Sequence, residues 1–427
     1  MTARLLAYEL LIKCEKNRQF SNIALDNALL SCDLCDADKR LASTLFYGVI
    51  EKRISLDYKI STLSSRKLDS LEPSVLTAIR LGIYQLAYLD RIPAHAAINE
   101  AVALFPKKAK GFVNAILRQY ERTPVTELPS VDTPIQYLSV KYSVGEPLAK
   151  KLIEVFGMER AEDILGGFEF PTRTTVRVNT LKTSREHLME RLEGAEETEL
   201  SSTGLYVKGA LRELFGYDEG LFFVQDQASQ ICVEALGARE GDVVIDVCAC
   251  PGSKSFGAAI DMKNTGSIKC YDLHQNKLSL VLSSARRLGI SIIDVEPHDG
   301  RELIDGLVGT ADRVICDVPC SGFGVLSKKP ELRYKDPAGS ERLPKIQRQI
   351  LNTACRYVRS GGVLVYSTCT IFPEENEHNV MEFLRDHPEF ELCAWSSGGI
   401  VAEDGMITLY PHVHKTDGFF IAKLLRK

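Results

Sequence analysis

"DVVIDVCACPGSKSFGAA" (residues 242–259) joins a short apolar run to a turn containing Pro251 and Gly252, followed by a segment of small residues. This order predicts a buried strand, a tight turn and a helix. The same order of strand, turn and helix recurs downstream, which predicts a parallel sheet covered by helices on both faces. Ligand sites of such α/β folds lie at the carboxyl ends of the strands. The closing pair of runs, "FELCAW" and "GFFIAKLLR", predicts one antiparallel strand at the edge of the sheet.

The sequence upstream of this stretch has a different character. Apolar residues recur at helical spacing in "ARLLAYELLIKCE" and "DKRLASTLFYGVIEKR", which predicts an all-α domain over residues 1–125. Three prolines in "TPVTELPSVDTP" indicate a linker, so residues 126–160 are expected to hold this linker and further helices. Period-two alternation in "TTVRVNT" predicts a small α+β segment over residues 161–235. The α/β domain then occupies residues 236–427, and a chain of 427 residues is long enough for this multidomain division.

The cysteines and the apolar runs bound the cellular context. The chain has twelve cysteines, most of them on apolar runs, and no secretion signal, so reduced thiols are expected. Cys32 and Cys35 have CxxC spacing, but no second pair accompanies them, and no metal site is predicted. No apolar run approaches the roughly 18 residues of a membrane span. A cytoplasmic protein without a membrane partner is therefore expected.

The charge is distributed unevenly. The formal net charge is −5, yet residues 1–150 contain 20 lysines and arginines against 16 aspartates and glutamates. Lys107, Lys108, Lys110 and Arg118 gather in "PKKAKGFVNAILRQYERT". These basic residues could make salt-dependent phosphate contacts with RNA, or they could form an ordinary solvated face.

The turn at Pro251 and Gly252 is a candidate cofactor loop. The N–H groups that open the following helix favour a negatively charged ligand group. The loop has neither dinucleotide-binding glycines nor a Walker A lysine motif, and a carboxylate would suit it as well as a phosphate. Asp272, Asp299 and Asp317 end or follow the next three strands, although each could instead cap a helix. Carboxylates at strand ends accept hydrogen bonds from ribose hydroxyls, so a nucleoside with an amino group, such as S-adenosylmethionine, is predicted.

Two cysteines end later apolar runs in the same manner, Cys320 in "CDVPCSGFGV" (316–325) and Cys369 in "VYSTCT" (365–370). C5 of a pyrimidine is too weak a nucleophile to take a methyl group, whereas a thiolate that adds to C6 activates C5. The C5 hydrogen and the thiol must then leave, which requires a second group. Two thiols and one carboxylate, Asp317, match this demand. Two buried structural thiols are the alternative, and the chemistry alone does not decide which cysteine attacks.

The motifs "DVCACPGSK", "DVPCSGFG", "STCT" and "TDGFFIAKL" resemble those of the RNA cytosine-C5 methyltransferases. "IRLGIYQLAYLDRIPAHAAINEAV" and "KGFVNAILR" resemble the NusB-like RNA-binding domain. Both domains occur together in the RsmB (Sun/Fmu) family, bacterial methyltransferases of 16S ribosomal RNA. The resemblance implies a NusB-like all-α domain and a Rossmann-like class I catalytic domain. It also implies methylation of C5 of a cytosine in 16S rRNA, or in a small-subunit assembly intermediate, by a monomer through a cysteine–C6 adduct.

The resemblance further implies roles for individual residues. Cys369 would be the nucleophile, Cys320 would assist breakdown of the adduct, and Asp317 would complete the catalytic group. The implied cofactor contacts are Cys248, Ala249, Cys250, Pro251, Gly252, Ser253, Lys254, Asp272, Asp299 and Asp317. Arg177 and Asn179, in the segment before the catalytic domain, would join the lysine patch in holding RNA.

This chain departs from the family pattern in the cofactor loop and in "KYSVGEPLAKKL" (141–152), which lacks an expected aromatic residue, and other functions stay open. The usual loop reads close to "CAAPGGKT", whereas this chain has Cys250, Ser253 and Ser255. Ser253 replaces a glycine, which leaves the contact geometry of the loop open. The same chemistry on tRNA or another RNA, methylation of the N4 amine of cytosine, and a non-catalytic RNA-binding role are the alternatives.

Overall fold

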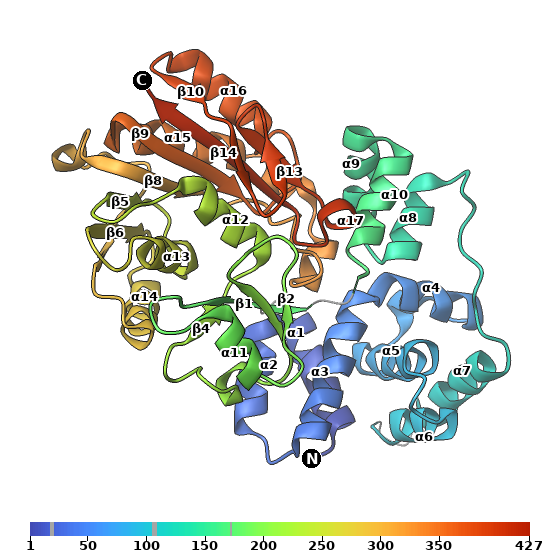
Figure 1. The fold of residues 1–427 in the computed structure, drawn as a ribbon. Coiled ribbons are helices and arrows are strands. Elements are labelled where there is room, and N and C mark those ends of the chain that lie inside the picture. Colours follow the sequence, from blue (N-terminus) through green and yellow to red (C-terminus); the bar gives the residue numbers. More distant parts are fainter. Residues whose placement is uncertain (18–20, 105–108, 171–172) are drawn as a thin grey trace. The chain divides into compact units, whose positions relative to one another are not determined.

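The computed structural model describes residues 1–17, 21–104, 109–170 and 173–427 (Figure 1). The chain forms two compact units. The helical unit comprises Met1–Glu169 together with Lys328–Pro337, and the sheet unit comprises Phe170–Ser327 with Ala338–Lys427. The boundaries of these units differ from the expected domain boundaries in two places. The helices of residues 134–167 belong with the N-terminal helices, and ten residues from the predicted α/β domain also belong to the helical unit.

The helical unit is built around apolar helix faces, as the spacing of its leucines predicts. Its helices are α1 (Ala3–Asn17), α2 (Ser21–Ser31), α3 (Asp36–Glu51), α4 (Arg53–Leu63), α5 (Pro73–Tyr88), α6 (Ala94–Ala103), α7 (Lys110–Arg122), α8 (Pro134–Tyr142), α9 (Glu146–Phe156) and α10 (Met158–Gly167). Leu45, Phe46 and Leu56 are fully buried in its core. In the described part of the chain, no helix is both long enough and apolar enough to cross a membrane.

The segment Lys328–Pro337 joins the helical unit through the side chains of Arg333 and Tyr334. Arg333, in the short helix η5 (Pro330–Tyr334), is 0% exposed. Its guanidinium donates to the carbonyl oxygen of Tyr142 at 2.8 Å and to Glu169 Oε1 at 3.1 Å. The hydroxyl of Tyr334 donates to the carbonyl oxygen of Ile50 at 2.5 Å. These polar contacts explain why the segment belongs to the helical unit, since local sequence does not reveal which core receives a buried arginine.

The first part of the sheet unit is a small α+β segment, as predicted. Its antiparallel sheet has the strand order β2-β3-β1-β4 and is accompanied by α11. The elements are β1 (Thr174–Val178), α11 (Arg185–Arg191), β2 (Glu196–Glu197), β3 (Gly204–Val207) and β4 (Phe222–Val224). Val176, Leu205 and Phe222 are fully buried and form its core.

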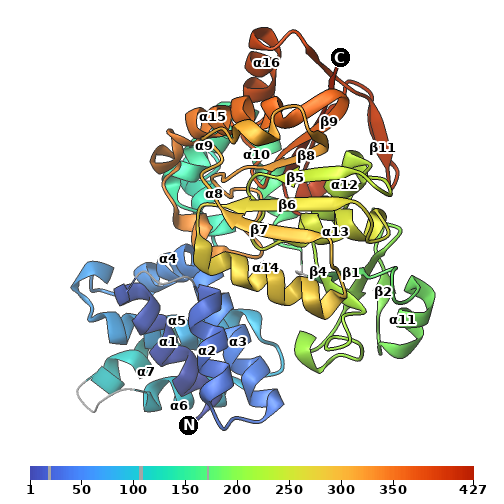
Figure 2. The same ribbon diagram turned by 90° about the vertical axis from the view of Figure 1, so that its left-hand side faces the viewer.

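The main sheet has the strand order β10-β14-β9-β8-β5-β6-β7, and β5 to β9 run parallel. Figure 2 shows β8, β5, β6 and β7 in succession. The helices and strands of the chain from residue 227 onward are α12 (Gln227–Leu236), β5 (Val243–Asp246), α13 (Ser253–Asp261), β6 (Ser267–Asp272), α14 (Gln275–Leu288), β7 (Ile293–Pro297), β8 (Ala311–Asp317), α15 (Leu343–Tyr357), β9 (Val358–Thr368), α16 (Glu377–Asp386), β10 (Phe390–Leu392), β11 (Trp395–Ser397), β12 (Ile400–Ala402), β13 (Met406–Leu409), α17 (Pro411–His414) and β14 (Phe419–Arg426).

Alternate residues of these strands pack on opposite faces of the sheet. Val244 and Ile315 lie in a core with α12, α13 and α14, whereas Ile245 and Val314 lie in a core with α15 and α16. The sheet is therefore covered on both faces, which confirms the predicted α/β architecture.

The closing runs form the antiparallel side of the sheet, and β10, within "FELCAW", is an antiparallel strand at its edge, as the sequence predicts. β14 is antiparallel to β9, and its other side pairs with β10 near Leu424 and with β13 near Phe420. The first four residues of β14 are buried, as expected for an inner strand. Two short strands cover its outer edge, and their pairing depends on contacts distant in sequence.

The burial of Arg333 leads to a prediction about the helical unit. Arg333→Met removes the donor to the carbonyls of Tyr142 and Phe168 and to Oε1 of Glu169. We expect a loss of about 2–3 kcal/mol of local stability, measured as faster hydrogen–deuterium exchange in peptides covering residues 134–169. Lys150→Met, which removes an exposed charge from the same unit, is the control. Equal exchange in the two variants would contradict this role.

Candidate active site

The order of the parallel strands brings the predicted site residues together. β6, β5, β8 and β9 are successive neighbours in the sheet. Asp272, Asp246 and Asp317 are the last residues of the first three, and Cys369 follows the fourth. Because the carboxyl ends of parallel strands share one edge of the sheet, one acid from each of three strands and one thiol meet there.

The loop between β5 and α13 is held by the end of the neighbouring strand β6. The N–H of Ala249 donates to the carbonyl oxygen of Tyr271 at 2.8 Å, and the N–H of Cys250 donates to Asp272 Oδ2 at 3.3 Å. Gly252 has φ of +103°, and a Cβ at this position would lie 2.5 Å from the ring of Phe256. Glycine is therefore required at residue 252. Ser253 is the first residue of α13, so the serine that replaces a family glycine adopts a helical conformation that any residue tolerates.

Asp246 is a site residue that the sequence analysis did not name. Its side chain is buried, Oδ2 accepts a hydrogen bond from Ser255 Oγ at 2.6 Å, and Oδ1 accepts one from the N–H of Cys248 at 3.3 Å. Burial raises the pKa of Asp246 to about 7, against the opposing hydrogen bond from Ser255. Asp246 thus fixes both ends of the loop, and Ser255, the other departure from the family loop, is its partner. An aspartate ending the strand before the loop was the available signal.

Lys254 and Asp317 form an ion pair beside the loop. Lys254 is 8% exposed, and its Nζ lies 2.6 Å from Asp317 Oδ2. Asp317 Oδ1 accepts a hydrogen bond from Ser367 Oγ at 2.6 Å. Burial lowers the pKa of Lys254, but the charge of Asp317 outweighs it and the net shift is upward. The lysine therefore stays charged and fixes the carboxylate of Asp317 at the end of β8.

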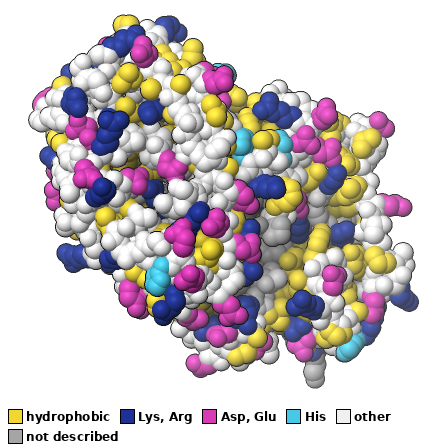
Figure 3. Space-filling model, viewed as in Figure 1, with side chains coloured by type: hydrophobic (Ala, Val, Ile, Leu, Met, Phe, Trp, Pro, Cys, Tyr) yellow, Lys and Arg dark blue, Asp and Glu magenta, His cyan; other side chains and the backbone are white. Residues whose placement is uncertain are grey.

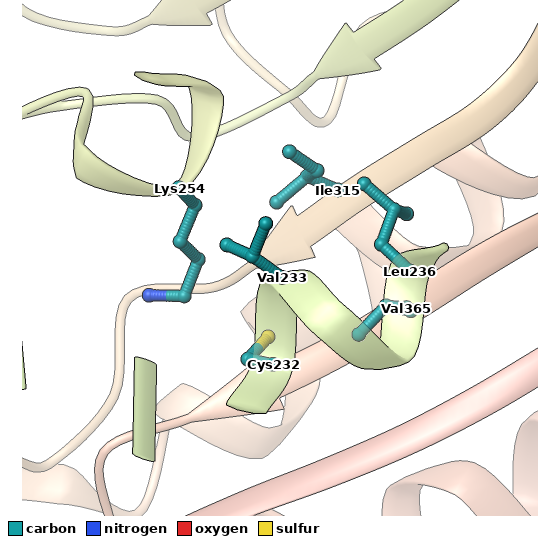
Figure 4. A pocket seen from close by; sticks show the side chains of 6 residues that line it. All are labelled: Cys232, Val233, Leu236, Lys254, Ile315 and Val365. Carbon is teal, nitrogen blue, oxygen red and sulfur yellow. The ribbon is translucent and has the colours of Figure 1, made fainter. Parts of the chain in front are cut away.

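The aliphatic stem of Lys254 packs on an apolar group. Lys254 lies beside Cys232, Val233, Leu236, Ile315 and Val365, which line a space too narrow to hold a water molecule. Figure 4 shows the amine of Lys254 directed away from the five other side chains. The apolar contacts hold the stem while the charged end reaches Asp317.

The two cysteines from the distant motifs lie in contact. Their sulfur atoms are 3.1 Å apart, both are free thiols, and the N–H of Cys369 donates to Cys320 Sγ at 3.3 Å. The hydrogen bond with Cys369, followed by burial, raises the pKa of Cys320 well above its ordinary value. The N–H of Gly324 donates to the carbonyl oxygen of Cys369 at 2.9 Å. A Cβ on Gly324 would lie 1.8 Å from the carbonyl oxygen of Gly418, so this close approach of three loops needs glycine.

The remaining predicted cofactor residues lie at the same edge of the sheet. Asp272 Oδ1 accepts a hydrogen bond from the N–H of His274 at 2.9 Å. Asp299 is paired with the guanidinium and the N–H of Arg301, and the hydrogen bond from that side chain lowers the pKa of Asp299 to about 2. A Cβ on Gly300 would lie 3.2 Å from the carbonyl oxygen of Val247. The turn at Asp299 is therefore next to the cofactor loop.

The described RNA-contact candidates of the helical unit, Lys110 and Arg118, lie on one helix, α7. Lys107 and Lys108 lie outside the described residues. Lys110 begins α7, and Arg118 on the same helix pairs with Glu121 at 2.9 Å. On the face shown in Figure 3, basic and acidic side chains are interspersed and form no single basic field.

Arg177 and Asn179 are buried, which corrects their expected role in touching RNA. Arg177 is 1% exposed and donates to Asp261 Oδ1 at 2.6 Å. Asn179 is fully buried and donates to the carbonyl oxygens of Gly220 and Leu288 at 2.9 and 2.8 Å. Both side chains tie the small α+β segment to α13 and α14. Period-two alternation does not distinguish a polar residue that faces solvent from one that bonds another segment.

The carboxylates at this edge of the sheet fit a nucleoside cofactor with an amino group. Carboxylates at three strand ends, Asp272, Asp299 and Asp317, surround a loop whose backbone is fixed by Asp246 and by Tyr271. Hydroxyl and amino groups both donate to carboxylates. In the described part of the chain, no group of three or more histidines, cysteines, aspartates and glutamates is arranged to hold a metal ion.

The pKa of Asp246 predicts a pH dependence of stability. Because folding raises this pKa from 3.8 to about 7, the folded chain binds an additional proton between these values. Stability contributed by this group is thus greatest at low pH and declines, by up to about 1.4 kcal/mol per pH unit, until pH 7 is passed. Asp246→Asn should remove this decline, measured by urea unfolding at pH 5.5 and 7.5. The fluorescence of Trp395, the single tryptophan of the chain and part of the sheet unit, reports the unfolding. Parallel pH profiles of the two proteins would contradict the raised pKa.

Comparison with known proteins agrees with this geometry. The family model for 16S rRNA methyltransferase RsmB/F matches residues 233–425, and the model for the NusB family matches residues 1–122. The probable ribosomal RNA small subunit methyltransferase B of Bacillus subtilis is 35% identical over 444 residues, covering 100% of this chain and 99% of the relative. Ribosomal RNA small subunit methyltransferase B of Klebsiella pneumoniae is 31% identical, covering 97% and 95%.

Solved structures are similar over the same regions. The crystal structure of PH0851 has a TM-score of 0.80 and 27% identity, covering 100% of this chain and 99% of that one. The structure of NSun6 from Pyrococcus horikoshii with SFG has a TM-score of 0.59 and 25% identity, covering 66% and 97%. These findings confirm the predicted NusB-like and Rossmann-like domains. The chain belongs to the RsmB/F family of 16S rRNA methyltransferases, whose cofactor is S-adenosylmethionine.

Proposed function

We propose that this protein methylates C5 of a cytosine in 16S ribosomal RNA through a covalent bond between the sulfur of Cys369 and C6 of the base. One observation carries the proposal. Two free thiols, Cys320 and Cys369, lie 3.1 Å apart at the ends of the adjacent strands β8 and β9, beside the carboxylate of Asp317. This pairing supplies both the nucleophile and the second group that C5 chemistry requires.

The attack on the base is assigned to Cys369. Its thiolate adds to C6, and the negative charge that results spreads to N3 of the ring. N3 takes up a proton from solvent, which returns to solvent when the adduct breaks down. The N3–H can donate a hydrogen bond to Asp317, each of whose oxygens retains acceptor capacity beside Lys254 and Ser367. S-adenosylmethionine, when bound, supplies the methyl group to C5. The residues Cys248 to Lys254, with Asp272, Asp299 and Asp317, would hold it.

The release of the product is assigned to Cys320. The C5 proton leaves, its electron pair forms the C5–C6 double bond, and the bond between C6 and the sulfur of Cys369 breaks. Overall, one C5 proton is exchanged for a methyl group and passes to solvent. Cys320 lies in direct contact with the sulfur that must leave, which supports a role in this last step.

The RNA is the part of the proposal that rests most on the comparisons. The match to the NusB family supports RNA binding by the helical unit, with Lys110 and Arg118 as its described candidate contacts. Because the thiols lie between strand ends, the target cytosine must be unpaired or turned out of its helix to reach them. We propose that the protein acts as a monomer on 16S rRNA or an assembly intermediate.

Substitution of the two cysteines separates attack from release. Cys369→Ala should lower methylation by a factor on the order of 10³ because it removes the nucleophile. Cys320→Ala should instead accumulate a protein–RNA adduct that survives SDS. Activity is measured as methyl transfer from labelled S-adenosylmethionine to 16S rRNA, and Cys393→Ala, another partly exposed free thiol, is the control. Full activity of Cys369→Ala would refute the assignment.

The position of the methyl group and the identity of the RNA form a second prediction. Nucleoside digestion of the product should yield 5-methylcytidine, and bisulfite sequencing of rRNA should lose one protected cytosine when the protein is removed from cells. N4-methylcytidine would contradict the covalent route. An unchanged rRNA map accompanied by a changed tRNA map would move the substrate to tRNA.

A further inference from the structure

The peptide groups on both sides of Cys320 are held by two buried side chains. Glu375 Oε2 accepts a hydrogen bond from the N–H of Ser321 at 2.9 Å. Gln347 Nε2 donates to the carbonyl oxygen of Pro319 at 3.0 Å and also to Glu375 Oε2 at 2.8 Å. We refer to Glu375 and Gln347 as the Cys320 clamp.

The Cys320 clamp is itself rigidly supported. Gln347 on α15 is fully buried, and its Oε1 accepts a hydrogen bond from Asn379 Nδ2 at 2.9 Å. The hydroxyl of Tyr366 on β9 donates to the backbone carbonyl of Glu375 at 2.6 Å. Glu375 is only 3% exposed, and a carboxyl group is rarely buried without a specific set of donors. Its donors here are groups that determine where Cys320 lies.

The Cys320 clamp also connects the two cysteine loops. Glu375 belongs to the turn that follows Cys369, and in that turn Thr370 Oγ1 accepts a hydrogen bond from Ser321 Oγ at 2.9 Å. Asn376 Nδ2 donates to the carbonyl oxygen of Thr370 at 3.0 Å. The residues after Cys369 therefore hold the residues around Cys320, and the contact between the two sulfur atoms depends on this connection.

We propose that Glu375 and Gln347 are positioning residues for product release: they hold the Cys320 thiol against the sulfur of Cys369 so that the adduct can break down. This inference rests on the proposed function. Cys369 directly follows β9, whose last residue, Thr368, is paired with Phe420 of β14, so loosening the Cys320 clamp should disturb Cys320 more than Cys369. Release should therefore slow while attack continues.

The charge of Glu375 adds an independent signature. The hydrogen bond to Cys369 and burial are the main causes that raise the pKa of Cys320. The negative charge of Glu375 raises this pKa further. Replacing this carboxylate by an amide removes the charge but keeps an oxygen that can accept from Ser321. Glu375→Gln should therefore lower the pKa of Cys320 while largely preserving its position.

The test uses the full-length protein, labelled S-adenosylmethionine and a 16S rRNA transcript. Glu375→Met and Gln347→Leu should each accumulate SDS-stable adduct at least about 5-fold above the unsubstituted protein, with the rate of adduct formation changed less than about 2-fold. Glu375→Gln should restore most of the release. The matched control is Glu234→Met on α12, because Glu234 also accepts hydrogen bonds from two side chains, Ser201 and Ser397, in the same unit.

The outcomes separate this inference from the proposed function. Cys320→Ala is the reference: if it traps no adduct, the proposed function and the role of the clamp both fail. If Cys320→Ala traps adduct but Glu375→Met releases product normally, or slows attack and release equally, only the clamp is refuted. If Glu375→Met does not fold, Glu375→Gln provides the test. The rate at which iodoacetamide alkylates Cys320 is then measured by peptide mass spectrometry as a function of pH, in this variant and in the unsubstituted protein. A shift of the profile to lower pH supports the clamp, and an unchanged profile refutes it.

Discussion

The parallel pairing of β8 with β9 is the constraint on which the site depends. In this register Asp317 lies opposite Ser367, and the N–H of Val318 donates to the carbonyl oxygen of Ser367 at 3.2 Å. The two motifs are 49 residues apart in the chain, yet the register brings their cysteines into contact. A slip of one residue would turn every side chain of one strand to the opposite face and separate the thiols. The apolar cores on both faces fix this register.

The ion pair of Lys254 and Asp317 links the two halves of the chemistry. Lys254 belongs to the helix that follows the candidate cofactor loop, whereas Asp317 precedes the Cys320 loop. A buried ion pair contributes little net stability, but it fixes geometry when its other acceptor sites are filled. Ser367 fills one of them, so the carboxylate has a defined orientation between the loop and the thiols.

The sequence predicted the chemical parts of the site better than the supports around them. The cofactor loop, the strand-end acids and both cysteines could be recognised because strands and motifs leave local signals. Arg177 and Asn179 were misread because burial of a polar side chain depends on a partner, here Asp261 or Leu288, that is distant in sequence. The membership of Arg333 in the helical unit was missed for the same reason. Glu375 was not singled out because its partners come from three separate segments.

The identity of the attacking sulfur is the central claim, and trapping of the covalent adduct tests it most directly. A 16S rRNA transcript containing 5-fluorocytidine, whose C5 cannot lose a proton after methyl transfer, should become bound to the protein in the presence of S-adenosylmethionine. Proteolysis and mass spectrometry then locate the attached nucleotide. The account predicts that it is on Cys369. Attachment to Cys320, or no attachment to a protein that still methylates unmodified RNA, would contradict it.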